Sequence, residues 1–455
     1  MSATPPPIGW GGIARLGLVQ ACLGAVVVLT TSTLNRVMVV ELGLPALLPG
    51  LLVGLHYVLQ VLRPRMGYGS DVGGRRTPWI VGGMATLALG GFTAAAAVVW
   101  MGSDRVAGIA LALAAFTLIG VGISAAGTSL LVLLAKRVDD ARRAPAATVV
   151  WVMMIVGFAV TAGIAGHLLD PYSPARLLAV CGGVSAAAFV VSTLALLGVE
   201  GRGGRAPVAA PEERPAFLAA LAAVWAEPAA RRFTVFVFVS MLAFSAQDLI
   251  LEPFAGLAFG YTPGESTQLS GVQHGGVLLG MIAVALAGGP LGRRWLPAAF
   301  GSLRLWTVGG CLVSGAALAG LVVGGAVGTG WPLRVNVFLL GAANGAFSIA
   351  AIASMMRMAG QGRERREGTR MGLWGASQAI AFGLGGLIGA TASDVARLLV
   401  GSPASAYGMV FVAEALLFVV AARMAWRVGR AEGEGAPAGA PAVAMQVAAV
   451  GLDRR

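Results

Sequence analysis

Residues 67–76 read GYGSDVGGRR, and residues 288–294 read GGPLGRR. Both stretches combine glycines, which permit a tight turn, with a closing pair of arginines, and each lies between two long apolar runs. Aligning Gly74 with Gly292 also aligns the first apolar run of the chain with the seventh. A repeat that runs in the same direction predicts a chain of two six-helix halves.

The composition is that of an integral membrane protein. Hydrophobic residues make up 57% of the 455 residues, charged residues only 11%, and the mean hydropathy is +0.82. A soluble domain carries about 25% charged residues, so a soluble enzyme, a disordered chain and a secreted disulfide scaffold are excluded. The 67 glycines allow close helix crossings in lipid, for example at Gly341/Gly345 and Gly385/Gly389. The three cysteines lie singly in apolar runs, so we expect no intrinsic metal site.

Twelve apolar runs are long enough to cross a bilayer, which takes roughly 20 residues per helix. We therefore predict an all-α integral membrane protein with twelve transmembrane helices. The predicted spans are residues 15–40, 46–63, 78–101, 106–134, 145–169, 175–198, 233–258, 267–289, 305–325, 332–358, 372–399 and 404–427.

The positive charges orient these spans. With the N-terminus in the cytoplasm, all but five of the 32 Lys and Arg residues fall on the cytoplasmic side, which places both termini there. The net charge of +12 then reflects cytoplasmic loops, and no nucleic-acid partner is expected. The predicted segments are a cytoplasmic N-terminus (1–14), the first six-helix half (15–199), a cytoplasmic linker (200–232), the second half (233–427) and a disordered cytoplasmic tail (428–455).

Charged side chains inside the spans mark one candidate site. Asn35 and Arg36 lie near the end of the first span, and Asp248 and Glu252 lie four residues apart, on one face of a continuous seventh span. At 1.5 Å per residue, Arg36 and Glu252 reach a similar depth near the outer interface. Because ionisable residues are costly in a bilayer, this patch is either a charged lock or substrate contact between the halves, or a structural ion pair.

The motif at 67–76 resembles the loop 2–3 signature of the major facilitator superfamily, whose fold the resemblance implies. In this reading Asp71 caps or pairs with a neighbouring helix end and the arginines anchor the cytoplasmic face. The alternative is a turn that merely retains its arginines. Gly289 stands at the aspartate position of the second copy. The signature residues are Gly67, Asp71, Gly74, Arg75 and Arg76, with Gly69 in place of the usual leucine.

Residues 33–43 and 247–254 resemble the PucC family, also called the bacteriochlorophyll delivery family, and the resemblance extends over all twelve spans. It implies an inner-membrane protein of a photosynthetic bacterium that handles bacteriochlorophyll, or a precursor, as cargo. It also implies a part in assembling light-harvesting complexes, with lipid, antenna polypeptides or bacteriochlorophyll synthesis enzymes as partners. Residues 54–64 and 70–79 most resemble the type encoded among bacteriochlorophyll synthesis genes, members of which are labelled as a bacteriochlorophyll synthase chain.

Two histidines are candidate pigment ligands, because a neutral imidazole could bind the magnesium of a chlorin. His56 and Gln60 lie one helical turn apart in the second span. His274 is followed by Gly275 and Gly276, which would leave room for a flat ring. A helix–helix hydrogen bond is the alternative for His56.

Signatures of catalysis are missing from the sequence. It contains no Walker A sequence, no H-E-x-x-H, no G-x-S-x-G and no D-x-x-x-D pair for diphosphate and magnesium. We therefore expect a non-enzymatic pigment-handling and assembly factor. Two alternatives stay open: a secondary transporter of a small solute, proton-coupled through Asp248 and Glu252, and a subunit of a bacteriochlorophyll synthase.

Overall fold

The computed structural model describes residues 8–63, 75–200, 225–360 and 367–433. Within these ranges every regular element is a helical segment, and eleven helices are long and apolar enough to cross a membrane. They correspond to eleven of the twelve predicted spans. The chain is therefore a multi-pass α-helical membrane protein. The predicted linker from 201 to 224 and the predicted tail from 434 onward lie outside the described residues.

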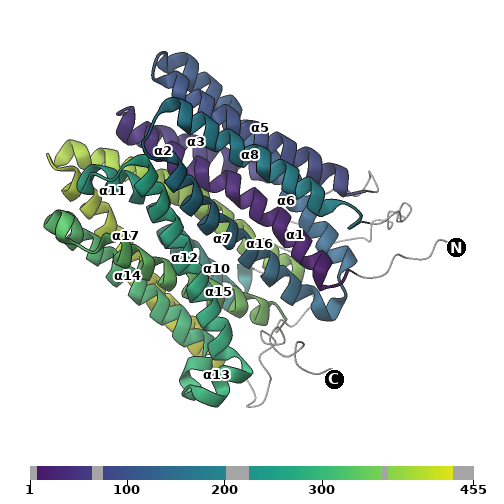
Figure 1. The fold of residues 1–455 in the computed structure, drawn as a ribbon. Coiled ribbons are helices and arrows are strands. Elements are labelled where there is room, and N and C mark those ends of the chain that lie inside the picture. Colours follow the sequence, from purple (N-terminus) through teal and green to yellow (C-terminus); the bar gives the residue numbers. More distant parts are fainter. Residues whose placement is uncertain (1–7, 64–74, 201–224, 361–366, 434–455) are drawn as a thin grey trace. The chain divides into compact units, whose positions relative to one another are not determined.

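The helices group into two compact units, each described by itself. The first unit comprises Met1–Ala210, Asp248–His274 and Ala390–Val395. In it α5 packs along α6 and α8, and α1 packs along α7 and α8 (Figure 1). Its segments are α1 (Trp10–Val28), η1 (Leu29–Thr33), α2 (Leu34–Arg36), η2 (Val37–Glu41), α3 (Leu47–Val58), η3 (Leu59–Leu62), α5 (Thr77–Met101), α6 (Arg105–Arg137), α7 (Asp140–Leu169), α8 (Pro174–Leu196), α11 (Leu251–Phe259) and the first half of α12 (Pro263–Gly288).

The second unit comprises Pro211–Gln247, Gly275–Gly389 and Ala396–Arg455. In it α14 packs against α15 and α17, and α10 packs against α17 (Figure 1). Its helices are α10 (Pro228–Ala246), the second half of α12, α13 (Pro290–Trp295), η5 (Ala298–Gly301), α14 (Leu303–Val327), η6 (Gly328–Gly330), α15 (Leu333–Gly360), α16 (Glu367–Leu399) apart from Ala390–Val395, and α17 (Pro403–Gly433). The segment η4 (Gln247–Leu249) contains the residue at which the first unit resumes, Asp248. Because α17 continues to Gly433, the first residues of the predicted tail are helical.

Small residues bring helices of the second unit into backbone contact. A Cβ atom on Gly385 would lie 2.0 Å from the Ser245 hydroxyl, and one on Gly389 would lie 2.3 Å from the Ala246 carbonyl oxygen. Any larger side chain would force α16 away from α10. The predicted close crossing at Gly385 and Gly389 is therefore confirmed.

The second predicted span is shorter than expected. Its α-helical part, α3, covers Leu47–Val58, and four residues of 3₁₀-helix follow in η3. The N-terminus of α3 is capped from far along the sequence: the two carboxylate oxygens of Asp394 accept the backbone N–H groups of Ala46 and Leu47 at 3.0 and 2.8 Å. A carboxylate at this position satisfies free donors and opposes the positive end of the helix dipole.

The first predicted span is not a uniform α-helix. After α1 the chain makes a π-helical turn at η1, one α-helical turn at α2 and a second π-helical turn at η2. Each π-helical turn holds one residue more than an α-helical turn. These two wide turns coincide with the polar end of the span, where Thr30–Arg36 is buried apart from Thr31.

The prediction of a continuous seventh helix over 233–258 is wrong. The α-helix α10 ends at Ala246, η4 follows, and α11 begins anew at Leu251. Pro253 accounts for part of this break, because it has no N–H to donate to the carbonyl group of Leu249, four residues back. That freed carbonyl oxygen instead accepts the side-chain amide of Asn35 at 2.8 Å. Asp248 and Glu252 thus lie on different helical segments rather than on one face.

Candidate functional site

Arg36 is the centre of the polar contacts in the first unit. Its side chain is only 3% exposed, although it carries a full charge. The guanidinium forms an ion pair with Glu41, donates to the backbone carbonyl of Tyr261 at 2.6 Å, and donates to the hydroxyl of Ser266 at 3.3 Å. One arginine therefore ties the end of the first span to the loop between α11 and α12.

The ion pair of Arg36 with Glu41 depends on the shape of η2. In an α-helix the side chains that meet are three or four residues apart, whereas Glu41 follows Arg36 by five. The π-helical turn, closed by a bond from the Leu42 N–H to the Val37 carbonyl at 3.0 Å, stacks residues at that wider spacing. The sequence therefore indicated Arg36 as a site residue but not its partner Glu41.

A cavity of about 570 Å³ opens beside this arginine. We call it the Arg36 pocket, and its volume is within the usual range for small-ligand sites, about 300–1,000 Å³. Burial, and next the carboxylate of Glu41, raise the pKa of Tyr172, so its phenol stays a neutral donor. The lining residues are Arg36, Glu41, Asp170, Pro171, Tyr172, Gly256, Gly260, Tyr261, Thr262 and Pro263.

Asp170 connects two parts of the lining of the Arg36 pocket, the end of α7 and the loop before α12. Its carboxylate accepts the hydroxyl of Thr262 at 3.1 Å, and the backbone of Gly264 comes so close that a Cβ atom there would lie 2.3 Å from the Asp170 carboxyl carbon. A second bond nearby joins the hydroxyls of Thr33 and Thr267 at 2.9 Å. The loop at the start of α12 is thus fixed to α7 and to the first span.

Glu252 is the second residue of α11, and its exposed fraction is only 3%. The groups that act on its carboxylate are the hydroxyls of Ser32 and Ser270, the charge of Arg36 and the carboxylate of Asp248. Among the described residues its Oε2 atom has no hydrogen-bond partner. The structure therefore brings the four predicted patch residues into one region, but gives Arg36 its ion pair with Glu41 rather than with Glu252.

The second span holds two candidate residues, His56 and Gln60, and the histidine is enclosed by protein. His56 is only 2% exposed, and its ring lies 4.2 Å from that of Tyr57. Gln60 is half-buried and belongs to the 3₁₀ segment η3. Because a 3₁₀-helix has three residues per turn, Gln60 does not continue the α-helical face of His56.

His274 has a more open setting in α12. The ring is half-buried, its Nδ1 atom lies 2.9 Å from the Ser270 carbonyl oxygen, and the ring of Phe158 meets it edge-on at 4.9 Å. A Cβ atom on Gly275 would meet nothing within 4 Å, whereas one on Gly276 would lie 2.3 Å from the Phe338 carbonyl oxygen. Only the first of the two glycines therefore leaves space, while the second serves helix packing.

The loop 2–3 motif is described only in part. Gly67, Asp71 and Gly74 lie outside the described residues, Arg75 is exposed and Arg76 is buried. The last residues before α5 are held by Glu200, whose carboxylate accepts the backbone N–H groups of Arg76 and Thr77. Burial acts to raise the pKa of Glu200, but these bonds, that of the Thr77 hydroxyl and the charge of Arg75 outweigh it and lower the pKa.

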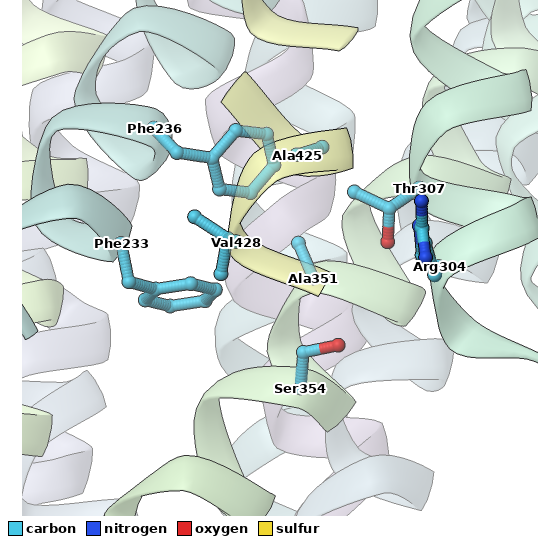
Figure 2. A pocket seen from close by; sticks show the side chains of 8 residues that line it. All are labelled: Phe233, Phe236, Arg304, Thr307, Ala351, Ser354, Ala425 and Val428. Atoms are coloured by element: carbon cyan, nitrogen blue, oxygen red, sulfur yellow. The ribbon is translucent and has the colours of Figure 1, made fainter. Parts of the chain in front are cut away.

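A second cavity is lined by residues of the second unit (Figure 2). It is much smaller, about 20 Å³. It can hold about one water molecule, so it excludes a pigment-sized ligand. The guanidinium of Arg304 at its rim stacks 3.7 Å from the centre of the Trp426 ring. Its lining residues are Phe233, Phe236, Arg304, Thr307, Ala351, Ser354, Ala425 and Val428.

The model of one protein family, described as PUCC protein, matches residues 33–433. This range includes the Arg36 pocket, Glu252 and both histidine candidates. The chain belongs to the PucC family. The resemblance inferred from residues 33–43 and 247–254 is thereby confirmed.

Curated relatives of this PucC-family chain match over most of their length. The bacteriochlorophyll synthase 44.5 kDa chain of Rhodobacter capsulatus is 55% identical over 427 residues, which cover 94% of this chain and 97% of the relative. Protein PucC of Cereibacter sphaeroides is 32% identical over 396 residues, which cover 82% and 81%.

Solved structures establish the fold of this PucC-family chain. A bacterial homologue of the human lysosomal transporter Spinster aligns with a TM-score of 0.67 at 15% identity, over 94% of this chain and 98% of that chain. The nucleoside transporter NupG aligns with a TM-score of 0.65 at 14% identity, over 92% and 98%. The predicted major facilitator fold is therefore confirmed.

Proposed function

We propose that this PucC-family protein handles bacteriochlorophyll or a late precursor within the membrane and assists the assembly of light-harvesting complexes, without catalysing a reaction. One relative is named a bacteriochlorophyll synthase 44.5 kDa chain, which supports a link to this pigment, and another is named Protein PucC. The fold supports a carrier rather than a catalyst, because the solved proteins that share it are transporters. An inner membrane with both termini in the cytoplasm is the location that we propose with it.

His274 is the residue that we propose as the pigment ligand. When its Nδ1 atom donates its proton to the Ser270 carbonyl, the Nε2 atom keeps a lone pair, as in protein sites where a backbone carbonyl orients a metal-binding histidine. The open space beside Gly275 favours approach of a flat ring. His56 is less suited, because a chlorin would have to displace the surrounding helices to reach a side chain that is 2% exposed.

The three histidines of the chain allow a matched test. We expect His274→Phe to lose most of the pigment that co-purifies with the wild-type protein from a bacteriochlorophyll-producing host, measured by absorption per mole of protein. His56→Phe and the exposed His167→Phe should keep it. Equal pigment in all three variants would rule out His274 as the ligand, and a pigment-free wild type would count against the proposed function.

Secondary transport of a small polar solute is the second candidate function. The Arg36 pocket favours it, because its volume suits a small molecule and its lining includes the charged side chains of Arg36, Glu41 and Asp170. Uptake of pigment precursors and of small polar solutes into proteoliposomes would separate the two candidates.

A further inference from the structure

Glu252 is a buried carboxyl group that is satisfied only in part. Its Oε2 atom and the side-chain carbonyl oxygen of Asn35 are buried and have no hydrogen-bond partner among the described residues. The two residues belong to neighbouring segments, since Asn35 donates its amide to Leu249, just before α11. The hydroxyls of Ser32 and Ser270 act on the carboxyl group as donors, but neither brings a positive charge that would balance an ionised carboxylate.

The positive charge nearby is already engaged. The guanidinium of Arg36 forms its ion pair with Glu41 and donates to Tyr261 and Ser266. The other ionisable group that acts on Glu252 is Asp248, and a second carboxylate disfavours a second negative charge. An ionised carboxylate that is buried and not paired is strongly unfavourable, whereas a protonated one is neutral and supplies a donor.

The Arg36 pocket gives this carboxyl group a route to water. Gly256 lines the pocket and follows Glu252 by four residues on α11, which places the two on one face about 6 Å apart along the helix. Arg36 also lines the pocket and acts on Glu252 from the opposite helix. The carboxyl group thus lies one helical turn beyond the wall of an open cavity that is lined in part by charged side chains.

We propose that Glu252 is a proton-binding site that exchanges with water through the Arg36 pocket, whatever cargo the protein handles. A proton from water in the pocket adds to a carboxylate oxygen of Glu252 and returns to water when the group ionises. Loss of the proton creates a negative charge whose nearest positive counterpart is Arg36. Ionisation therefore draws Arg36 from Glu41 and from the carbonyl of Tyr261, and loosens the loop between α11 and α12.

Difference infrared spectroscopy on the full-length protein in lipid nanodiscs tests this site directly. We expect a carbonyl-stretching band of a protonated carboxyl group at neutral pH, which disappears at alkaline pH and shifts in D₂O. The band should be absent in Glu252→Gln and shifted in Glu252→Asp, which also covers the case in which Glu252→Gln does not fold. Asp104→Asn is the matched control, because Asp104 is an exposed carboxylate that caps α6, and the band should persist in it.

Three results would overturn the proposal. The first is a wild-type protein without the band. The second is a band that is lost in Asp248→Asn and kept in Glu252→Gln. The third is stabilisation by Na⁺ at constant pH that Glu252→Gln abolishes, which would show that Glu252 binds a metal cation rather than a proton. None of these readouts requires pigment, so they are independent of the function proposed above.

Discussion

The contacts of Arg36 predict that its contribution to stability depends on the carboxylate of Glu41 rather than on that of Glu252. Arg36→Gln removes the ion pair with Glu41 and leaves the carbonyl of Tyr261 without its donor. Hydrogen bonds to charged groups contribute about 1.5–3 kcal/mol each. Glu41 is 35% exposed, so water takes over part of its interaction and its contribution falls below that range. We expect Arg36→Gln to lower the free energy of unfolding by about 3 kcal/mol, and Glu41→Gln by about 1 kcal/mol.

A double-mutant cycle measures the coupling of this pair. Because both single variants lose the same ion pair, the double variant should be about 1 kcal/mol more stable than the sum of the single effects predicts. The assay is chemical denaturation of the purified protein in detergent micelles at neutral pH. Arg36→Lys is the control for charge, and we expect it to be destabilising as well, because an ammonium group cannot reproduce the fork of guanidinium donors.

The same cycle on Arg36 and Glu252 is the decisive comparison. A protonated Glu252 has no charge for Arg36 to neutralise, so this cycle should show a coupling below about 0.5 kcal/mol at neutral pH. Strong coupling to Glu252 together with strict additivity for Glu41 would refute both the ion-pair assignment and the proton site.

Three further substitutions probe the contacts around the two ends of the first unit. Glu200→Gln should destabilise the protein by about 1 kcal/mol at neutral pH by weakening the cap before α5. Folding lowers the pKa of Glu200, so the stability difference between wild type and variant should persist above the ordinary pKa of a glutamate and fade as the pH drops through the lowered pKa. Thermal unfolding measured across pH tests this. Gly264→Ala should cost about 1–3 kcal/mol by pushing its Cβ atom into the carboxylate of Asp170, and Gly264→Ala combined with Asp170→Ala should recover part of the loss in the same denaturation assay. Asp394→Ala should cost about 0.5–2 kcal/mol by uncapping α3, which hydrogen exchange at the start of that helix would detect, whereas Asp394→Asn should keep part of the cap.

The helical membrane architecture could be predicted from the sequence, because it depends on the average composition of long segments rather than on single contacts. Runs of apolar residues, small residues at four-residue spacing and paired arginines in turns each recur many times, and bilayer thickness leaves little choice of helix length. The family followed from two stretches, residues 33–43 and 247–254. Both stretches lie where the helices depart from regular geometry.

The partners within the site were harder to predict, because they depend on those departures. Glu41 could be matched to Arg36 only with knowledge of a π-helical turn, which has no distinct sequence pattern. Asp170 and Asp394 approach their partners from distant parts of the chain, 92 residues from Thr262 and 348 residues from Ala46. Pro253 could have signalled the break in the seventh span, because it has no backbone N–H to donate, but the apolar run alone predicted an unbroken helix.

The π-helical turn at η1 also limits how the length of the first span can change. One extra residue in a turn advances every later side chain by about 100° around the helix. A one-residue deletion within Leu29–Thr33 could therefore restore a regular helix at almost no local cost, yet it would turn Arg36 away from Tyr261 and Ser266. A one-residue insertion would rotate the same side chain in the other sense. The backbone of this segment can therefore accommodate an insertion or a deletion of one residue. The function of the segment cannot, because either change would turn Arg36 away from its partners.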